Sequence, residues 1–405
     1  MSGNATTLLE SVTPLLDRIG VAADVMDSEG RLPAGLARSL AEAGAFRSTV
    51  PAAIGGLEVP VADLAATIEA IARCHGSTAW CVMIGATTAL LSAYLPEAAA
   101  REVYGTDPLV ITGGAYAPTG RAVLGDDGSL TVSGRWEWGS GSANCSWLLG
   151  GAVVVDAAGQ PVPDPDGRPQ MRLCFAPATD VLIVDNWDVL GMRGTGSNDL
   201  VMDGVRVPAG HAVSLVDDRP WAAGPLYRFP PFGLLALGIG AVALGVARSA
   251  MDAFVGLAVA KTPAMASRAL ATRAAVRAEV GRCEADLRAA RALYFDEIDR
   301  AWSRAESGAV SPGAVSSGAE SSGADFSVDE RASLRLAATH AATVGADVCS
   351  RLHRLGGGTS VRHGQVLERA LRDSHTATQH ILVGWSLYET VGGVLLGAEP
   401  GWAEL

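Results

Sequence analysis

The spacing of hydrophobic and polar positions divides the chain into three parts. In the first part Leu32, Leu36 and Leu40 lie on one stripe at helical spacing, and two mostly apolar helical stretches follow. In the middle part, short runs rich in Val, Leu and Trp are separated by Gly, Asp and Pro, which is typical of strands joined by turns. Helical spacing returns in the last part. The pattern predicts a helical domain at 1–110, a β domain at 111–215 and a helical domain at 216–405.

The longest uncharged run, Phe229–Ala247, lies in the last part. It has two prolines near its start and four glycines after them. About 20 consecutive apolar residues are needed to span a bilayer. We therefore expect a helix that is buried inside a bundle or at a subunit interface, and no membrane partner.

Several local signals place the boundaries of the expected elements. The sequence GDDG at Gly125–Gly128 predicts a hairpin turn, and Ser77 is expected to cap the second apolar helix. A long amphipathic helix is expected at 267–302. Residues 306–326 are of low complexity, with Gly-Ala recurring every five residues, which predicts a flexible acidic loop. SVDE at 327–330 then has the form of a capping box, so a new helix is expected to begin there.

Composition excludes several classes of function. The formal net charge is −12 and basic residues are not clustered, which argues against a nucleic-acid partner. The six cysteines form no CxxC pair, so no metal site is expected. We expect the six cysteines to be free thiols. The N-terminus lacks the basic start and apolar stretch of a signal peptide, which predicts a cytoplasmic location.

Four stretches together resemble the acyl-CoA dehydrogenase superfamily. They are LPAGLARSLAEAGAFRSTVPAAIGGLEV at 32–59, GRWEWGSGSANCSW at 134–147, LGMRGTGSNDLVMDGVRVP at 190–208 and RLGGGTSVRHGQVLERALRDSHTATQH at 354–380. The resemblance implies an α+β fold with an N-terminal helical domain, a middle β-barrel or sandwich domain and a C-terminal four-helix bundle. It also implies a flavin enzyme that assembles as a homotetramer.

The superfamily contains two chemistries, and the position of a base separates them. Dehydrogenases use a glutamate to remove an α-proton from an acyl-CoA, since that proton is only weakly acidic. The glutamate usually lies eight residues after the Asp of an Arg-Asp pair; counted from Asp373 this position is Ile381. The minority position lies on the first bundle helix, where Phe229–Ala247 has no carboxylate. Both positions for the dehydrogenase base therefore lack a carboxylate.

The resemblance therefore favours the monooxygenase branch. It implies a chain that takes reduced flavin (FADH2 or FMNH2) from a separate flavin reductase, forms a C4a-hydroperoxide and hydroxylates a small aromatic or amine substrate. Two alternatives stay open. One is an acyl-CoA dehydrogenase with FAD and an unusual base, and the other is a catalytically silent flavin-binding or scaffold subunit.

Two histidines are the candidate catalytic groups. His375 and His380 lie five residues apart, and on a helix they would differ by about 140°, so they would face different neighbours. His380 adjoins the position of the missing glutamate. We expect His380 to face the flavin and the substrate, with an imidazole of ordinary pKa acting at neutral pH.

In the resemblance, Trp138 covers one flavin face, and the Ser140 hydroxyl meets the N5 edge and contributes to catalysis. The Gly-rich stretch GGAYAPTGRA contains Thr119 and Gly120, which are expected to supply backbone donors to the flavin ring.

Arg273 and Arg277 lie one turn apart on the expected long helix. Two interpretations stay open: the side chains reach the flavin phosphates of a neighbouring subunit, or they are solvated charges on the helix surface.

Overall fold

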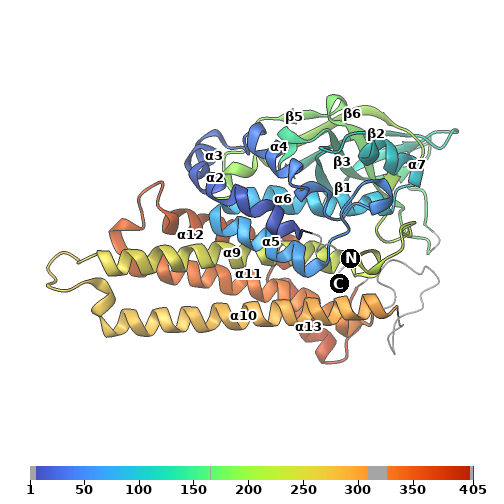
Figure 1. Ribbon diagram of the computed structural model, residues 1–405. Coiled ribbons are helices and arrows are strands. Elements are labelled where there is room, and N and C mark those ends of the chain that lie inside the picture. The colour runs from blue at the N-terminus through green and yellow to red at the C-terminus, as the bar shows by residue number, and fades with distance from the viewer. Residues whose placement is uncertain (1–5, 165, 309–325, 402–404) are drawn as a thin grey trace, which may run out of the picture.

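The computed structural model describes residues 6–164, 166–308, 326–401 and 405. In the N-terminal part, from residue 6 onwards, the α-helices are α1 Leu8–Val12, α2 Leu16–Val21, α3 Ala23–Glu29, α4 Ala34–Glu42, α5 Val61–Cys74, α6 Gly76–Ala89 and α7 Glu97–Ala100. The expected stripe is buried, with Leu32, Leu36 and Leu40 at most 3% exposed. Helices α5 and α6 lie between the sheet and the C-terminal helices (Figure 1).

The cap of α6 differs from the sequence expectation. The N-cap is His75, whose side chain accepts a hydrogen bond from Thr78 N, and Ser77 lies inside the helix. His75 has an extended backbone, with φ −160°, and this orientation turns its imidazole back over the first turn. Imidazole is an uncommon cap, so the usual preference for serine led to the wrong residue.

The middle part is one mixed sheet with the strand order β5-β6-β2-β1-β3-β4-β7. The strands are β1 Thr112–Leu124, β2 Leu130–Gly139, β3 Trp147–Val155, β4 Met171–Pro177, β5 Leu182–Val184, β6 Asn198–Val207 and β7 Ala212–Val213. β1 pairs with β3 in parallel, and the other pairs are antiparallel. The expected turn is confirmed, since Leu124 pairs with Leu130 across Gly125–Gly128. β4 also contacts β6, so the sheet curls towards a barrel.

Trp136 fills the inside of the curled sheet. It is 1% exposed and donates its Nε1–H to Gly151 O at 2.7 Å. A Cβ atom added at Gly120, Gly134 or Gly150 would lie within 2.8 Å of the indole ring. These glycines are therefore required for the close packing of Trp136.

In the C-terminal part, the described residues form the helices α8 Pro225–Arg228, α9 Pro231–Ala260, α10 Ala274–Ser307, α11 Val328–Gly356, α12 Val366–Ala377 and α13 Ser386–Leu395. α9 contacts α10, α11 and α12, which gives the expected four-helix bundle (Figure 1). The segments Gly76–Ala93 and Pro231–Ala260 are long and apolar enough to cross a membrane, but in the most apolar 18 residues of each segment 94% and 89% of the residues are buried inside the protein. Both segments therefore serve as core helices, as expected for Phe229–Ala247.

Other boundary predictions are confirmed in part. Ser327 and Glu330 form the expected capping box, and α10 begins at Ala274 instead of residue 267. Leu270 N donates to Lys261 O at 2.7 Å, which holds the chain before α10 in a loop. Of the expected flexible loop, residues 309–325 lie outside the described part of the chain. Phe326, at its end, is buried against Phe229, with ring centroids 6.4 Å apart.

Candidate active site

Ser140, Trp80 and His380 lie together at the end of β2. Ser140 directly follows this strand, Trp80 lies on α6, and His380 follows α12. Trp80, on α6, donates its Nε1–H to Ser140 Oγ at 3.2 Å. The ring of His380 contacts the same indole edge-on, with centroids 5.7 Å apart. The two residues that the resemblance singled out are thus linked through a tryptophan that the sequence analysis did not select.

A chain of buried hydroxyl groups extends from Ser140 into the protein. Ser140 Oγ lies 2.6 Å from Ser197 Oγ, which lies 2.6 Å from Thr195 Oγ1. Thr195 Oγ1 then donates to Met192 O at 2.7 Å. None of the three hydroxyl residues is more than 5% exposed. Ser197 and Thr195 belong to the quoted stretch at 190–208, but their contact with Ser140 could not be read from it.

His380 does not lie on a helix, in contrast to the expectation. α12 ends at Ala377, and His380 is the N-cap of a short 3-10 turn, Ile381–Val383. Thr376 and Thr378 each donate a side-chain hydrogen bond to a backbone carbonyl of α12. Such local bonds compete with helix continuation, which accounts for the early end.

The protonation state of His380 follows from its surroundings. Burial, together with the nearby charge of Arg335, lowers the pKa of His380 from 6.5 to about 4. The ring is therefore neutral at neutral pH, which replaces the expectation of an ordinary pKa. Its Nδ1 accepts a hydrogen bond from Leu382 N at 3.2 Å, so the proton of the neutral ring resides on Nε2. His380 can donate a hydrogen bond from Nε2.

This lowered pKa predicts a pH-dependent stability. Between pH 4 and 6.5 the unfolded chain binds a proton at His380 that the folded chain does not, so the free energy of unfolding falls as the pH decreases through this window. We expect wild type to lose about 2 kcal/mol more than His380→Asn between pH 7 and pH 4, after allowance for screening of the half-buried ring. Asn still caps Leu382 N. Parallel denaturant titrations test this; equal losses in the two proteins would contradict it.

His375 lies apart from this cluster. It is exposed on α12, and its Nε2 lies 2.7 Å from Ser350 Oγ on α11. The two histidines therefore have different neighbours, and only His380 contacts Trp80.

An ion-pair network holds α12 against α3, next to the cluster of Ser140, Trp80 and His380. Asp27 on α3 pairs with Arg369 at 3.0 Å and with Arg372 at 3.2 Å, and Arg372 also pairs with Glu368 at 2.6 Å. Burial would raise the pKa of Asp27, but contacts to His75 and Arg369 outweigh it and hold the pKa well below its usual range.

The Arg-Asp pair at 372–373 connects α12 to the loop that carries the hydroxyl chain. Arg372 donates to Leu190 O at 3.0 Å, and Asp373 accepts a hydrogen bond from Met192 N at 2.6 Å. Asp373 is buried, and this burial raises its pKa. It therefore acts as a structural acceptor, while Ile381, at the position of the dehydrogenase base, is 81% exposed.

Trp138 has a strained backbone beside Ser140. Its φ is 66°, in the left-handed region that a bulky residue rarely adopts, and its side chain is 66% exposed. A strained and exposed indole contributes little to folding, which favours a ligand-binding role.

Thr119 and Gly120 have different surroundings. Thr119 is exposed and donates to Arg135 O at 3.3 Å, on the neighbouring strand. Gly120 faces Trp136 inside the sheet, where an added Cβ atom would clash with the indole, and its role as a backbone donor to the flavin stays a prediction.

Arg273 and Arg277 are exposed at the start of α10, away from the cluster. Arg277 donates to Ala271 O at 2.8 Å. Within the described residues no carboxylate lies at ion-pair distance from either guanidinium, so both charges are available at the surface.

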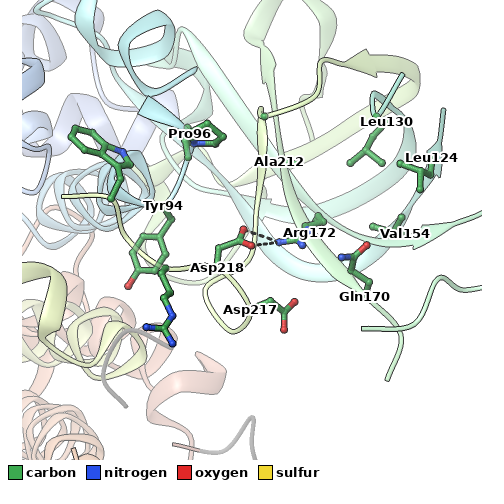
Figure 2. Close-up of a pocket in the computed structure, with 15 residues that line it drawn as sticks. Tyr94, Pro96, Leu124, Leu130, Val154, Gln170, Arg172, Ala212, Asp217 and Asp218 are labelled. Atoms are coloured by element: carbon green, nitrogen blue, oxygen red, sulfur yellow. Dashed lines mark hydrogen bonds and ion pairs between the residues drawn. The ribbon is translucent and has the colours of Figure 1, made fainter. Parts of the chain in front are cut away.

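A separate cavity of about 580 Å³ lies between the sheet and the segment that precedes α8 (Figure 2). Arg172 and Asp218 form a two-point ion pair in its wall, and Tyr94 and Trp221 also line it. Its described lining residues include none of the predicted site residues. The location of the active site therefore rests on the polar contacts of Ser140 and His380.

Comparison with known proteins identifies the family. Residues 7–103 match the family described as "Acyl-CoA dehydrogenase, N-terminal domain", and residues 237–385 match "Acyl-CoA dehydrogenase, C-terminal domain". Indole-3-acetate monooxygenase of Pseudomonas putida is 32% identical over 359 residues, which cover 88% of this chain and 85% of that protein. The chain belongs to the acyl-CoA dehydrogenase superfamily, in its flavin-dependent monooxygenase branch.

Other members of this branch agree. The oxygenase component of the FADH(2)-dependent resorcinol hydroxylase of Rhizobium sp. is 28% identical over 407 residues, which cover 95% of each chain. The crystal structure of the HsaA monooxygenase from M. tuberculosis matches 98% of this chain and 99% of its own, with a TM-score of 0.85 and 26% identity. As a monooxygenase-branch member, the chain is a flavin-dependent oxidoreductase that works with a small-molecule substrate.

Proposed function

We propose that the chain is the oxygenase component of a two-component monooxygenase, which hydroxylates a small aromatic substrate with reduced flavin delivered by a separate reductase. The observation that carries the proposal is a neutral His380 against Trp80, next to Ile381 where a dehydrogenase needs a carboxylate. Isoleucine cannot remove an α-proton from an acyl-CoA. A neutral imidazole with a proton on Nε2 can instead bind an oxygen atom.

The residues of the cluster fit a flavin ring. Trp138 would cover one face of the ring and Ser140 would meet its N5 edge, while Thr119 lies on the strand beside Trp138. Bound reduced flavin would supply the electrons that activate dioxygen. Arg273 and Arg277 would reach the flavin phosphates of a neighbouring copy in a homotetramer, since both are exposed and cationic.

Trp138 allows the stacking role to be separated from folding. Glycine adopts a φ of 66° without strain, so Trp138→Gly is expected to melt at or above the wild-type temperature. It should also bind reduced flavin roughly tenfold more weakly, as expected for a lost aromatic contact. Trp138→Phe keeps an aromatic surface and should bind nearly as wild type. A lower melting temperature with unchanged affinity for Trp138→Gly would exclude the stacking role.

Aromatic compounds are the favoured substrate class because the cluster has aromatic walls. The rings of Trp80 and His380 meet at an interplanar angle of 61°, which leaves edges and faces that an aromatic ring can contact. Relatives from Pseudomonas putida and Acinetobacter baumannii, 32% and 27% identical, are named indole-3-acetate monooxygenase. We therefore propose an indole or a phenol as the substrate.

A substrate panel tests the proposal. The chain is mixed with chemically reduced FAD or FMN and air in the presence of indole-3-acetate, indole, resorcinol or an acyl-CoA, and the products are measured by mass spectrometry. We expect a hydroxylated aromatic product that depends on reduced flavin. Formation of an enoyl-CoA would show a dehydrogenase. Turnover of none of these compounds, together with no binding of either flavin state, would show a silent scaffold.

A further inference from the structure

We infer that Thr195 and Ser197 fix the direction of the hydrogen bond of Ser140, so that Ser140 presents only an acceptor to the flavin and the site selects reduced over oxidised flavin. The inference rests on the proposed function, in which Ser140 faces the N5 edge. Thr195 and Ser197 are then positioning residues, since both act through Ser140.

The hydroxyl hydrogen of Thr195 is fixed by a contact with Met192. Thr195 Oγ1 lies 2.7 Å from Met192 O. A carbonyl oxygen carries no hydrogen, and two oxygen atoms at this distance repel each other unless a hydrogen lies between them. The Thr195 hydroxyl hydrogen therefore points to Met192 O.

The donor and acceptor of the next two hydrogen bonds are then fixed in turn. Thr195 Oγ1 and Ser197 Oγ are 2.6 Å apart, and since the Thr195 hydrogen is already used, Ser197 must donate to Thr195. Ser140 and Ser197 are also 2.6 Å apart, so Ser140 must donate to Ser197 in turn. The hydroxyls are at most 5% exposed, which leaves water little access to reverse the order.

Trp80 completes the environment of Ser140. Its Nε1–H can only donate, and it occupies one lone pair of Ser140 Oγ at 3.2 Å. A hydroxyl group has one hydrogen and two lone pairs. Ser140 is therefore left with one free lone pair and no free hydrogen for a bound flavin.

The two redox states of flavin differ at the atom that Ser140 would face. N5 of reduced flavin carries a hydrogen and donates, whereas N5 of oxidised flavin has a lone pair and accepts. The free lone pair of Ser140 forms a hydrogen bond with the first and repels the second. An oxygenase component must take up reduced flavin and release oxidised flavin, so this selection fits the proposed function.

The acceptor at the far end of the hydroxyl chain is itself fixed. Met192 O also accepts from Trp187 Nε1 at 3.1 Å, and Met192 N donates to the buried Asp373 at 2.6 Å. The peptide groups on both sides of Met192 are thus held by neighbouring elements. The orientation of this carbonyl sets the order of all three hydroxyls.

Thr195→Val tests the inference most sharply, because it removes a hydroxyl group that is two hydrogen bonds away from Ser140 and does not touch the flavin. Without Thr195 Oγ1, Ser197 can donate to Ser140, and the Ser140 hydrogen becomes free to bind N5 of oxidised flavin. Anaerobic titrations with reduced and oxidised FAD and FMN give the ratio of the two dissociation constants. We expect the preference for reduced flavin to fall roughly tenfold in Thr195→Val, the effect of one hydrogen bond.

Two further variants complete the design. Ser197→Ala frees the same Ser140 hydrogen and should lower the preference equally, which covers the case of a poorly folded Thr195→Val. Thr195→Ser restores the hydroxyl and should behave as wild type. Thermal melts report on folding in each case.

The outcomes separate the inference from the proposed function. If Thr195→Val and Ser197→Ala leave the ratio unchanged or weaken both flavin states equally, while Ser140→Ala changes the ratio, the ordered hydroxyl chain is wrong and the flavin site stands. If Ser140→Ala alters the affinity for neither state, the flavin does not bind at Ser140, and both the inference and the proposed site fail.

Discussion

His380→Ala is expected to lower the yield of hydroxylated product per reduced flavin by about a hundredfold, while reduced flavin still binds. His380 offers an Nε2 hydrogen beside Trp80, and loss of one well-placed donor at a reacting oxygen typically costs ~10²–10³-fold in rate. Dioxygen that is reduced by the flavin but not inserted into the substrate should be released as hydrogen peroxide. Product and peroxide are measured together in single-turnover reactions.

His375→Ala is the matched control for this prediction. It removes an imidazole from the same segment, but one that is exposed and contacts Ser350 on α11. Its product yield should stay close to that of wild type. If His375→Ala is the defective variant, or if both variants hydroxylate normally, His380 has no catalytic role.

Asp27→Ala is expected to reduce the free energy of unfolding by about 3 kcal/mol, because removal of one partner from a buried ion pair leaves the other charge without compensation. The side chains of Arg369 and Arg372 are only 11% and 12% exposed, and both contact Asp27. Each keeps a second carboxylate, Asp24 or Glu368, so the loss should stay at the lower end of the usual range. Urea titrations at fixed protein concentration measure the change.

Asp252→Ala provides the comparison for Asp27→Ala. Asp252 also pairs with an arginine of another helix, Arg73, but the two side chains are 43% and 59% exposed. An exposed pair contributes at most about 1 kcal/mol. Equal losses in the two variants would show that burial of the Asp27 network is energetically unimportant.

The sequence predicted those features that depend on neighbouring residues. The turn at Gly125–Gly128 and the capping box at Ser327 each require only a few adjacent side chains, and both are confirmed. The burial of Phe229–Ala247 followed from its lack of charge. The order of helices and strands followed from the same local patterns.

The contacts that build the candidate site could not be predicted in this way. Trp80 and Ser140 are 60 residues apart, and Ser140 and Ser197 are 57 residues apart, so no local pattern joins them. The protonation state of His380 could not be predicted either, because its lowered pKa depends on burial and on Arg335 of α11. The resemblance supplied Ser140 and His380, but not the partners that determine their chemistry.

Labelled oxygen tests directly whether the chain is an oxygenase that uses reduced flavin. The chain is mixed with reduced FAD, indole-3-acetate and ¹⁸O₂ in unlabelled water, and the mass of the product is measured by mass spectrometry. We expect a product with one ¹⁸O atom, formed only when reduced flavin is supplied. A hydroxylated product whose added oxygen comes from water, or one that forms without reduced flavin, would contradict this claim.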